Sequence, residues 1–185
     1  MKHLVVFLYI IIFSYTQNIY CNSPKQISFN PRSQPHKNDW KFFNETTAQW
    51  KINFWNHYIR ENFKFNNWSW KWKIAWLNAC KNENLPFCSE ILIKSLENKA
   101  HIIRKHAISI SPDNFRISLD SNIIVKLEDI YLLLNSRNIN HQVLQKEILL
   151  SLWRISTEAS LSAGKILAAK SSFSQDYWQK LQKKY

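Results

Sequence analysis

The chain has 185 residues, with 25 lysines and arginines against 13 aspartates and glutamates, and it contains a single glycine. Phosphate-binding loops and dinucleotide-binding turns need several glycines, so the composition excludes these nucleotide sites. Tight hairpin turns also favour glycine, which argues against a sandwich or barrel of many strands. Because 45% of the residues are hydrophobic, we expect one folded domain with its own core.

The first 21 residues have the pattern of a secretory signal peptide. The positive start Met1-Lys2-His3 is followed by an apolar run over residues 4–13 and then by polar residues up to Cys21. The run is shorter than the about 20 residues that a membrane-spanning helix needs. We therefore predict a secreted protein with a signal peptide over residues 1–21; an uncleaved signal anchor and a core helix are the alternatives. The cleavage site stays open, because Ser14 and Thr16 are small residues at a suitable spacing and a cut after Cys21 is also compatible with the pattern. Residues 22–38 hold three of the five prolines and predict a flexible, disordered leader.

Removal of the signal peptide after Cys21 leaves an even pair of cysteines. In an oxidising compartment Cys80 and Cys88 are expected to form a disulfide across a short loop, and two free buried thiols are the alternative. The sequence also contains two sequons, Asn44-Glu45-Thr46 and Asn67-Trp68-Ser69. In a eukaryotic secretory pathway Asn44 and Asn67 would be glycan acceptors.

From residue 39 onward the hydrophobic pattern is helical. A first helix is predicted over residues 46–63, where aromatic residues recur at four-residue spacing, and a second over residues 68–80. A third is predicted over residues 89–110 and is expected to end before Pro112. Residues 115–119 alternate between apolar and polar, which indicates a short strand or extended chain. A fourth helix is predicted to begin near Ser121.

The clearest predicted helix covers residues 148–169. Its apolar and small residues follow an unbroken heptad spacing, at Ile148, Leu152, Ile155, Ala159, Ser162, Ile166 and Ala169. This indicates the central helix of a bundle, with an intermolecular coiled coil as the alternative, and Gly164 is expected to allow close helix packing. The predicted fold is all-α, a bundle of four or five helices over residues 39–178, with a basic tail at residues 179–185.

Tryptophan and lysine alternate in one segment of the second predicted helix. Seven of the nine tryptophans lie between Trp40 and Trp76. The candidate contact residues are Trp68, Trp70, Lys71, Trp72, Lys73 and Trp76. Three interpretations stay open: a core, a protein-binding hot spot, and a surface that enters a membrane.

No catalytic or metal-binding motif is present. His57 and Glu61 are four residues apart and could share one face of a helix, whereas His101 and His106 are five apart and do not. His141 belongs to no recognised pattern. We therefore predict a protein that is not an enzyme and needs no metal or cofactor, with an unrecognised active site as the alternative.

The surplus of positive charge indicates an anionic partner. Removal of residues 1–21 deletes only Lys2, which leaves 24 basic against 13 acidic residues. A secretory signal disfavours nucleic acid. We expect a secreted binding protein that contacts an extracellular protein partner or receptor of acidic character, with an anionic membrane surface as the alternative target.

Overall fold

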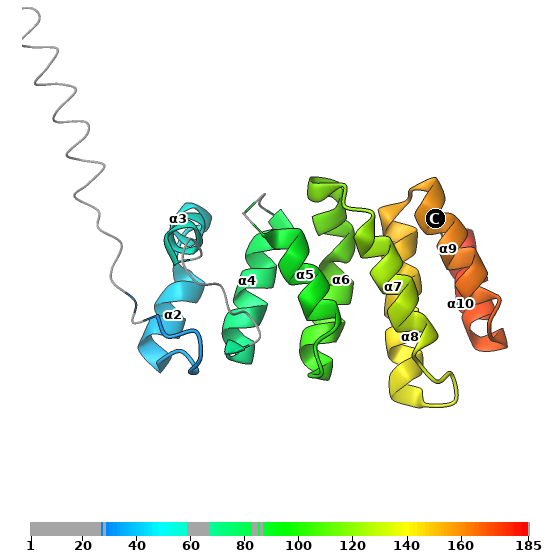
Figure 1. Ribbon diagram of the computed structural model, residues 1–185, viewed down its shortest axis with the longest axis horizontal. Coiled ribbons are helices and arrows are strands. Elements are labelled where there is room, and N and C mark those ends of the chain that lie inside the picture. Colours follow the sequence, from blue (N-terminus) through cyan, green and yellow to red (C-terminus); the bar gives the residue numbers. More distant parts are fainter. Residues whose placement is uncertain (1–26, 28, 59–66, 83–84, 86, 185) are drawn as a thin grey trace, which may run out of the picture.

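A computed structural model describes residues 27, 29–58, 67–82, 85 and 87–184. The predicted signal peptide lies outside these residues. The described residues are all-helical, as predicted, with nine helices and no strand. The predicted bundle of four or five helices is not confirmed, because the helices are more numerous, shorter and arranged in a row (Figure 1).

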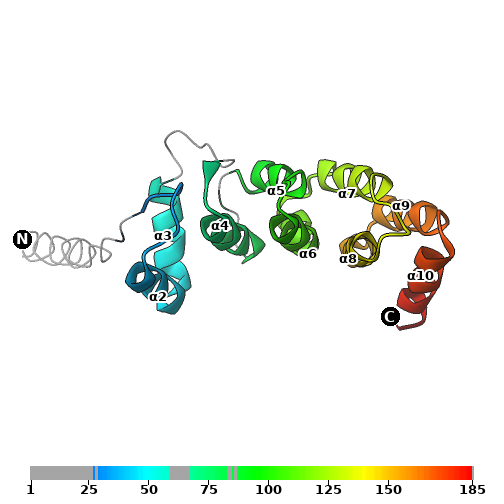
Figure 2. The same cartoon turned by 90° about the horizontal axis from the view of Figure 1, so that it is seen from below.

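The row is built from antiparallel helices in two layers (Figures 1 and 2). One layer consists of α4 (Trp70–Asn82), α6 (His101–Ser118), α8 (Ile139–Ile155) and α10 (Ser172–Lys184), and each of these helices contacts the next. The other layer consists of α5 (Cys88–Leu96), α7 (Asn122–Leu132) and α9 (Glu158–Ala168). Because each helix contacts mainly its neighbours along the row, the architecture is of the kind seen in α-solenoids.

The N-terminal end of the row is covered by α2 (Lys37–Glu45) and α3 (Ala48–Tyr58). These helices meet α4 through aromatic side chains, and Trp55 and Trp72 are fully buried between them. Part of the predicted leader belongs to this core, since Ile27 is buried and the ring of Phe29 lies 5.0 Å from that of Trp72. At the other end, the segment predicted as a basic tail continues α10 to Lys184.

The third predicted helix is divided into α5 and α6. Asn98 lies in the turn between them, and its side-chain oxygen accepts a hydrogen bond from the backbone of Ala100 at 2.9 Å. Asparagine forms such local bonds readily, and they compete with helix formation. The predictions that the helix ends before Pro112 and that residues 115–119 form a strand or extended chain are wrong, because α6 runs through both as far as Ser118.

A serine from the neighbouring helix accommodates this proline. Pro112 has no N–H, so it cannot bond the carbonyl of Ile108 four residues earlier. Ser151 of α8 instead donates its hydroxyl to that carbonyl at 2.7 Å, and Ser151 is buried. The missing helical hydrogen bond is therefore replaced by a tertiary one, which sequence spacing does not reveal.

The long heptad helix is divided into α8 and α9. Ser156 adopts a left-handed conformation with φ of 60°, and Thr157 caps α9 by a reciprocal pair of hydrogen bonds with Ser160. The turn shifts the buried face, so that Ser160 and Leu167 are buried in α9 whereas the heptad position Ile166 is 60% exposed. The prediction of a single continuous helix is therefore wrong beyond residue 155.

Gly164 packs as predicted. A Cβ atom placed on it would overlap the indole ring of Trp178. Only a residue without a side chain lets the indole ring of α10 lie this close to the backbone of α9.

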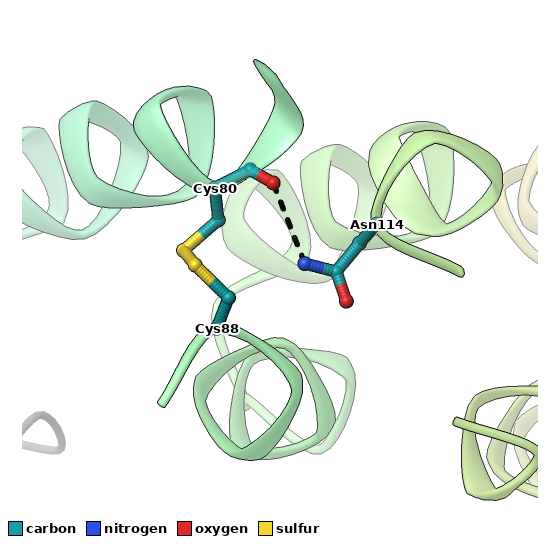
Figure 3. The surroundings of a disulfide bond; sticks show 3 residues. All are labelled: Cys80, Cys88 and Asn114. Atoms are coloured by element: carbon teal, nitrogen blue, oxygen red, sulfur yellow. Dashed lines mark hydrogen bonds between the residues drawn. A yellow bond between two sulfur atoms is a disulfide. The ribbon is translucent and has the colours of Figure 1, made fainter. Parts of the chain in front are cut away.

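The predicted disulfide between Cys80 and Cys88 is present (Figure 3). It joins the last turns of α4 to the first residue of α5, with the two Cα atoms 5.4 Å apart. The amide of Asn114, on α6, donates a hydrogen bond of 3.4 Å to the carbonyl of Cys80. Three helices are therefore fastened together at this point.

Candidate functional site

The tryptophan and lysine segment lies mainly inside the protein. Trp68, Trp72 and Trp76 are buried, and the Trp72 and Trp76 side chains are fully so. Trp76 packs edge-on against Trp55 with ring centroids 5.0 Å apart. Lys73 is also buried, and burial lowers the pKa of its amine. These three tryptophans therefore belong to the hydrophobic core, the first of the three interpretations of this segment.

The other two candidate residues reach the surface. Trp70, the first residue of α4, is 46% exposed. Lys71 is half-buried, and its Nζ lies 5.9 Å from the Trp70 ring centroid and 5.8 Å from that of Trp40 on α2. A lysine amine at this distance from an indole face is attracted electrostatically by the ring.

An apolar cleft lies between α2, α3 and α4, and the Trp40 ring that Lys71 approaches is part of its lining. It has a volume of about 300 Å³ and is lined by Trp40, Phe43, Asn44, Ala48, Lys51, Ile52, Trp55, Ile74, Ala75, Asn78 and Ala79. Lys51 is the one charged side chain in this lining, and its Nζ donates to the carbonyl of Asn44 at 3.2 Å. The cleft can bury an apolar side chain next to a cation.

The exposed side of α4 continues from the cleft. Ile74 and Asn78 line the cleft, and Lys81 follows one turn later on the same helix face. The side-chain oxygen of Asn78 is 2.8 Å from Nε2 of His106 on α6. Burial and the nearby charge of Lys81 lower the pKa of His106, which favours its neutral form.

Three cations meet around one carboxylate at the end of this face. Asp113 of α6 lies 3.9 Å from Lys81 of α4, 3.3 Å from Arg116 of α6 and 3.5 Å from Arg154 of α8. The Asp113 side chain is only 14% exposed, whereas those of Lys81, Arg116 and Arg154 are 47%, 71% and 43% exposed. We call Lys81, Arg116 and Arg154 the basic cluster. The cluster presents three positive charges to solvent, while the negative charge of Asp113 between them is largely covered.

The basic cluster lies on the layer of α4, α6 and α8, and the cleft lies where α2 and α3 meet the α4 end of that layer. Figure 2 shows α4, α6 and α8 side by side, with α2 at one end and α10 at the other projecting beyond them on the side away from α5, α7 and α9. The row of helices is therefore curved, with α2 and α10 on the same side of α4, α6 and α8. Neither the cleft nor the cluster was predicted, because both depend on how different helices pack against one another.

The remaining polar candidates are dispersed. His57 is exposed and packs edge-on against Tyr58, with ring centroids 4.8 Å apart, while Glu61 lies outside the described residues. His141 accepts a hydrogen bond from the backbone of Asn135 at 3.0 Å, which holds the turn between α7 and α8. Within the described ranges, no three His, Cys, Asp or Glu side chains are grouped so that they could hold a metal ion.

Both sequon asparagines are at the surface. Asn44 is exposed near the end of α2 and lines the cleft, and Asn67 is exposed before α4 begins. A glycan on Asn44 would stand at the mouth of the cleft, so the state of this residue bears directly on access to it.

Comparison with known protein families, curated proteins and solved structures gives no match for this chain. Among the helices of the described residues, none is both long and apolar enough to span a bilayer.

Proposed function

We propose that this chain is a secreted, basic, helical binding protein that acts through contact with a protein partner or receptor and does not catalyse a reaction. The observation that carries the proposal is that the apolar cleft and the basic cluster lie next to each other, since adjoining turns of α4 contribute residues to both. Protein interfaces combine such features, because an apolar pocket buries an anchoring side chain while charges around it orient the partner.

The charge of the chain supports an acidic partner. The net formal charge is +12, and no carboxylate is among the described residues that line the cleft. A positive surface accelerates encounter with a negative one, and salt weakens this effect. The protein is therefore expected to associate faster at low than at high ionic strength.

Secretion is tested by following the chain in cells that express it. The expected product appears in the medium, and its N-terminal sequence begins close to residue 22. A cell-retained product that still begins at Met1 would contradict the proposed secretion.

Partner binding is tested with the labelled, secreted protein on intact cells of the source organism and, where it has one, of its host. Saturable binding that disappears after mild protease treatment of the cell surface supports a protein partner. Equal binding to protein-free vesicles that contain anionic lipid, with a blue shift of tryptophan emission that persists in added salt, would instead establish the membrane alternative. Absence of binding to both cells and vesicles would overturn the proposed function.

A further inference from the structure

We propose that the partner presents an acidic segment with one large apolar side chain, which enters the apolar cleft while neighbouring carboxylates pair with the basic cluster. This inference rests on the proposed binding function and specifies the chemistry of its partner. It follows from the cleft, the basic cluster, and the continuous face of α4 that joins them.

The cleft fits one side chain. Its volume of about 300 Å³ is at the lower end of the range for pockets that hold whole small molecules. Its walls are mostly apolar, from Trp40, Ile52, Ile74 and Trp55 among others. A buried aromatic or aliphatic side chain of a partner would replace water there, which is the contribution that anchors an interface.

The basic cluster is held in place and remains available to an anion. Asp113 can balance one of the three positive charges around it, so the group keeps an excess of two. Arg116 and Arg154 each have a guanidinium nitrogen within 3.5 Å of the same Asp113 oxygen, which restrains both side chains. Their remaining N–H groups can donate to carboxylate oxygens, a pairing that arginine geometry favours.

The spacing of the two features sets the size of the partner segment. Ile74 and Lys81 are seven residues apart on α4, which corresponds to about 10 Å along the helix. The charged groups of Lys81 and Arg154 lie 3.9 Å and 3.5 Å from the same Asp113 carboxylate, so Arg154 adds at most about 10 Å to this span. A segment of about three to four helical turns can therefore place an apolar side chain in the cleft and carboxylates over the cluster.

The proposal is tested with a defined probe, a fluorescent helical peptide of 18 residues with one central leucine and glutamates on the same face. A second peptide with glutamine at each glutamate position is the probe's control. Affinity is measured by fluorescence anisotropy at near-physiological salt. The protein carries Asn44→Gln so that no glycan stands at the cleft, and its cell binding is first compared with that of the unaltered protein.

Two sets of variants separate charge from cleft. In the first, Lys81→Gln, Arg116→Gln and Arg154→Gln are combined; the matched control removes three exposed lysines of α9 and α10 by Lys165→Gln, Lys180→Gln and Lys183→Gln. In the second, Ala48→Phe fills the cleft, and Ala159→Phe on the exposed side of α9 is its control. Arg154→Gln alone is included because it leaves Asp113 with two cationic neighbours and so protects the fold.

The expected result is a loss of affinity of about tenfold to a hundredfold for the cluster variant, because each of the three exposed ion pairs contributes a factor of about two to five. Ala48→Phe should weaken binding similarly, Arg154→Gln by less, and the two control variants by under twofold. The glutamine peptide should bind the protein with an intact cluster more weakly by about the same factor, and the cluster variant should weaken it little further. Equal losses in the cluster variant and its control would show that only net charge matters, and would overturn the proposal.

The same variants on cells distinguish this inference from the function on which it rests. Protease-sensitive cell binding that the cluster and cleft variants leave unchanged would place the partner elsewhere on the molecule and refute the inference, while the binding function would stand. Loss of binding in both variants, with helical circular dichroism unchanged, is the expected outcome. If no cell binding is found with any protein, the function itself fails.

Discussion

The hydroxyl of Ser151 completes a helix that Pro112 interrupts, and its removal is expected to destabilise the protein. In Ser151→Ala the carbonyl of Ile108 loses the donor that lies 2.7 Å from it, and Ser151 is only 2% exposed, so water does not readily replace it. Leaving a buried carbonyl unsatisfied costs about 1–3 kcal/mol. The free energy of unfolding, measured by urea denaturation followed by circular dichroism, should fall by this amount, and the melting temperature by several degrees.

Two further variants test the cause of this loss. Ser111→Ala also removes a buried serine hydrogen bond, from Ser111 to the carbonyl of Ala107 at 2.9 Å. That carbonyl keeps its helical N–H donor, so the cost should stay below about 1 kcal/mol. In a Pro112→Ala background the new N–H at residue 112 can bond Ile108, and the effect of Ser151→Ala should shrink by about 1–2 kcal/mol. Equal effects of Ser151→Ala with and without the proline would refute the proposed compensation.

Four other predictions concern different parts of the row. Gly164→Ala should lower the free energy of unfolding by about 1–3 kcal/mol, because its Cβ would overlap the Trp178 ring; in a Trp178→Phe background the loss should largely vanish, and an undiminished loss would contradict the contact. Joint replacement of Cys80 and Cys88 by alanine should cost about 2–3 kcal/mol from the unfolded-state entropy of the short loop, whereas an unchanged urea midpoint would show that the disulfide adds nothing. Leu119→Gly should stabilise the protein by about 1 kcal/mol, because Leu119 is 73% exposed and has a φ of 54°, a backbone conformation that is unfavourable for residues with a side chain. A lower free energy of unfolding in this variant would contradict the prediction. The pKa of His106 is lowered in the folded state, so the unfolded state binds its proton more readily and the free energy of unfolding should fall as the pH drops below about 6.5. His106→Gln should reduce this dependence of stability on pH, and an equal dependence in both proteins would contradict the prediction.

Local sequence patterns were sufficient for the fold class, the disulfide and the role of the glycine. Apolar spacing predicted helices because a helix must bury one face, and the helix that begins near Ser121 is confirmed as α7. The pairing of Cys80 with Cys88 followed from the short loop between them and from the even count that would remain after removal of the predicted signal peptide. Gly164 could be assigned to helix packing because small residues surround it within an apolar stripe.

The division into short helices and the arrangement of the candidate site depended on tertiary contacts. The helix breaks at Asn98 and Ser156 are caused by side-chain hydrogen bonds and a left-handed residue, which change the direction of the chain. The hydrophobic spacing of the sequence continues through both breaks and therefore does not reveal them. Alternation of tryptophan with lysine could not show that Trp72 and Trp76 face inward, because the same pattern suits a helix docked on a core and a helix on a surface.

The sequence by itself determined the local features of this protein, namely the helical periodicity, the excess of positive charge and the cysteine pair. The tertiary structure decided which charges stand together. Lys81, Asp113 and Arg154 are separated by more than thirty residues at each step, and they meet only because α4, α6 and α8 pack side by side in one layer. Side-chain contacts between helices depend on how the helices stack and on where each turn places the next one, and that information is not contained in the pattern of any single helix.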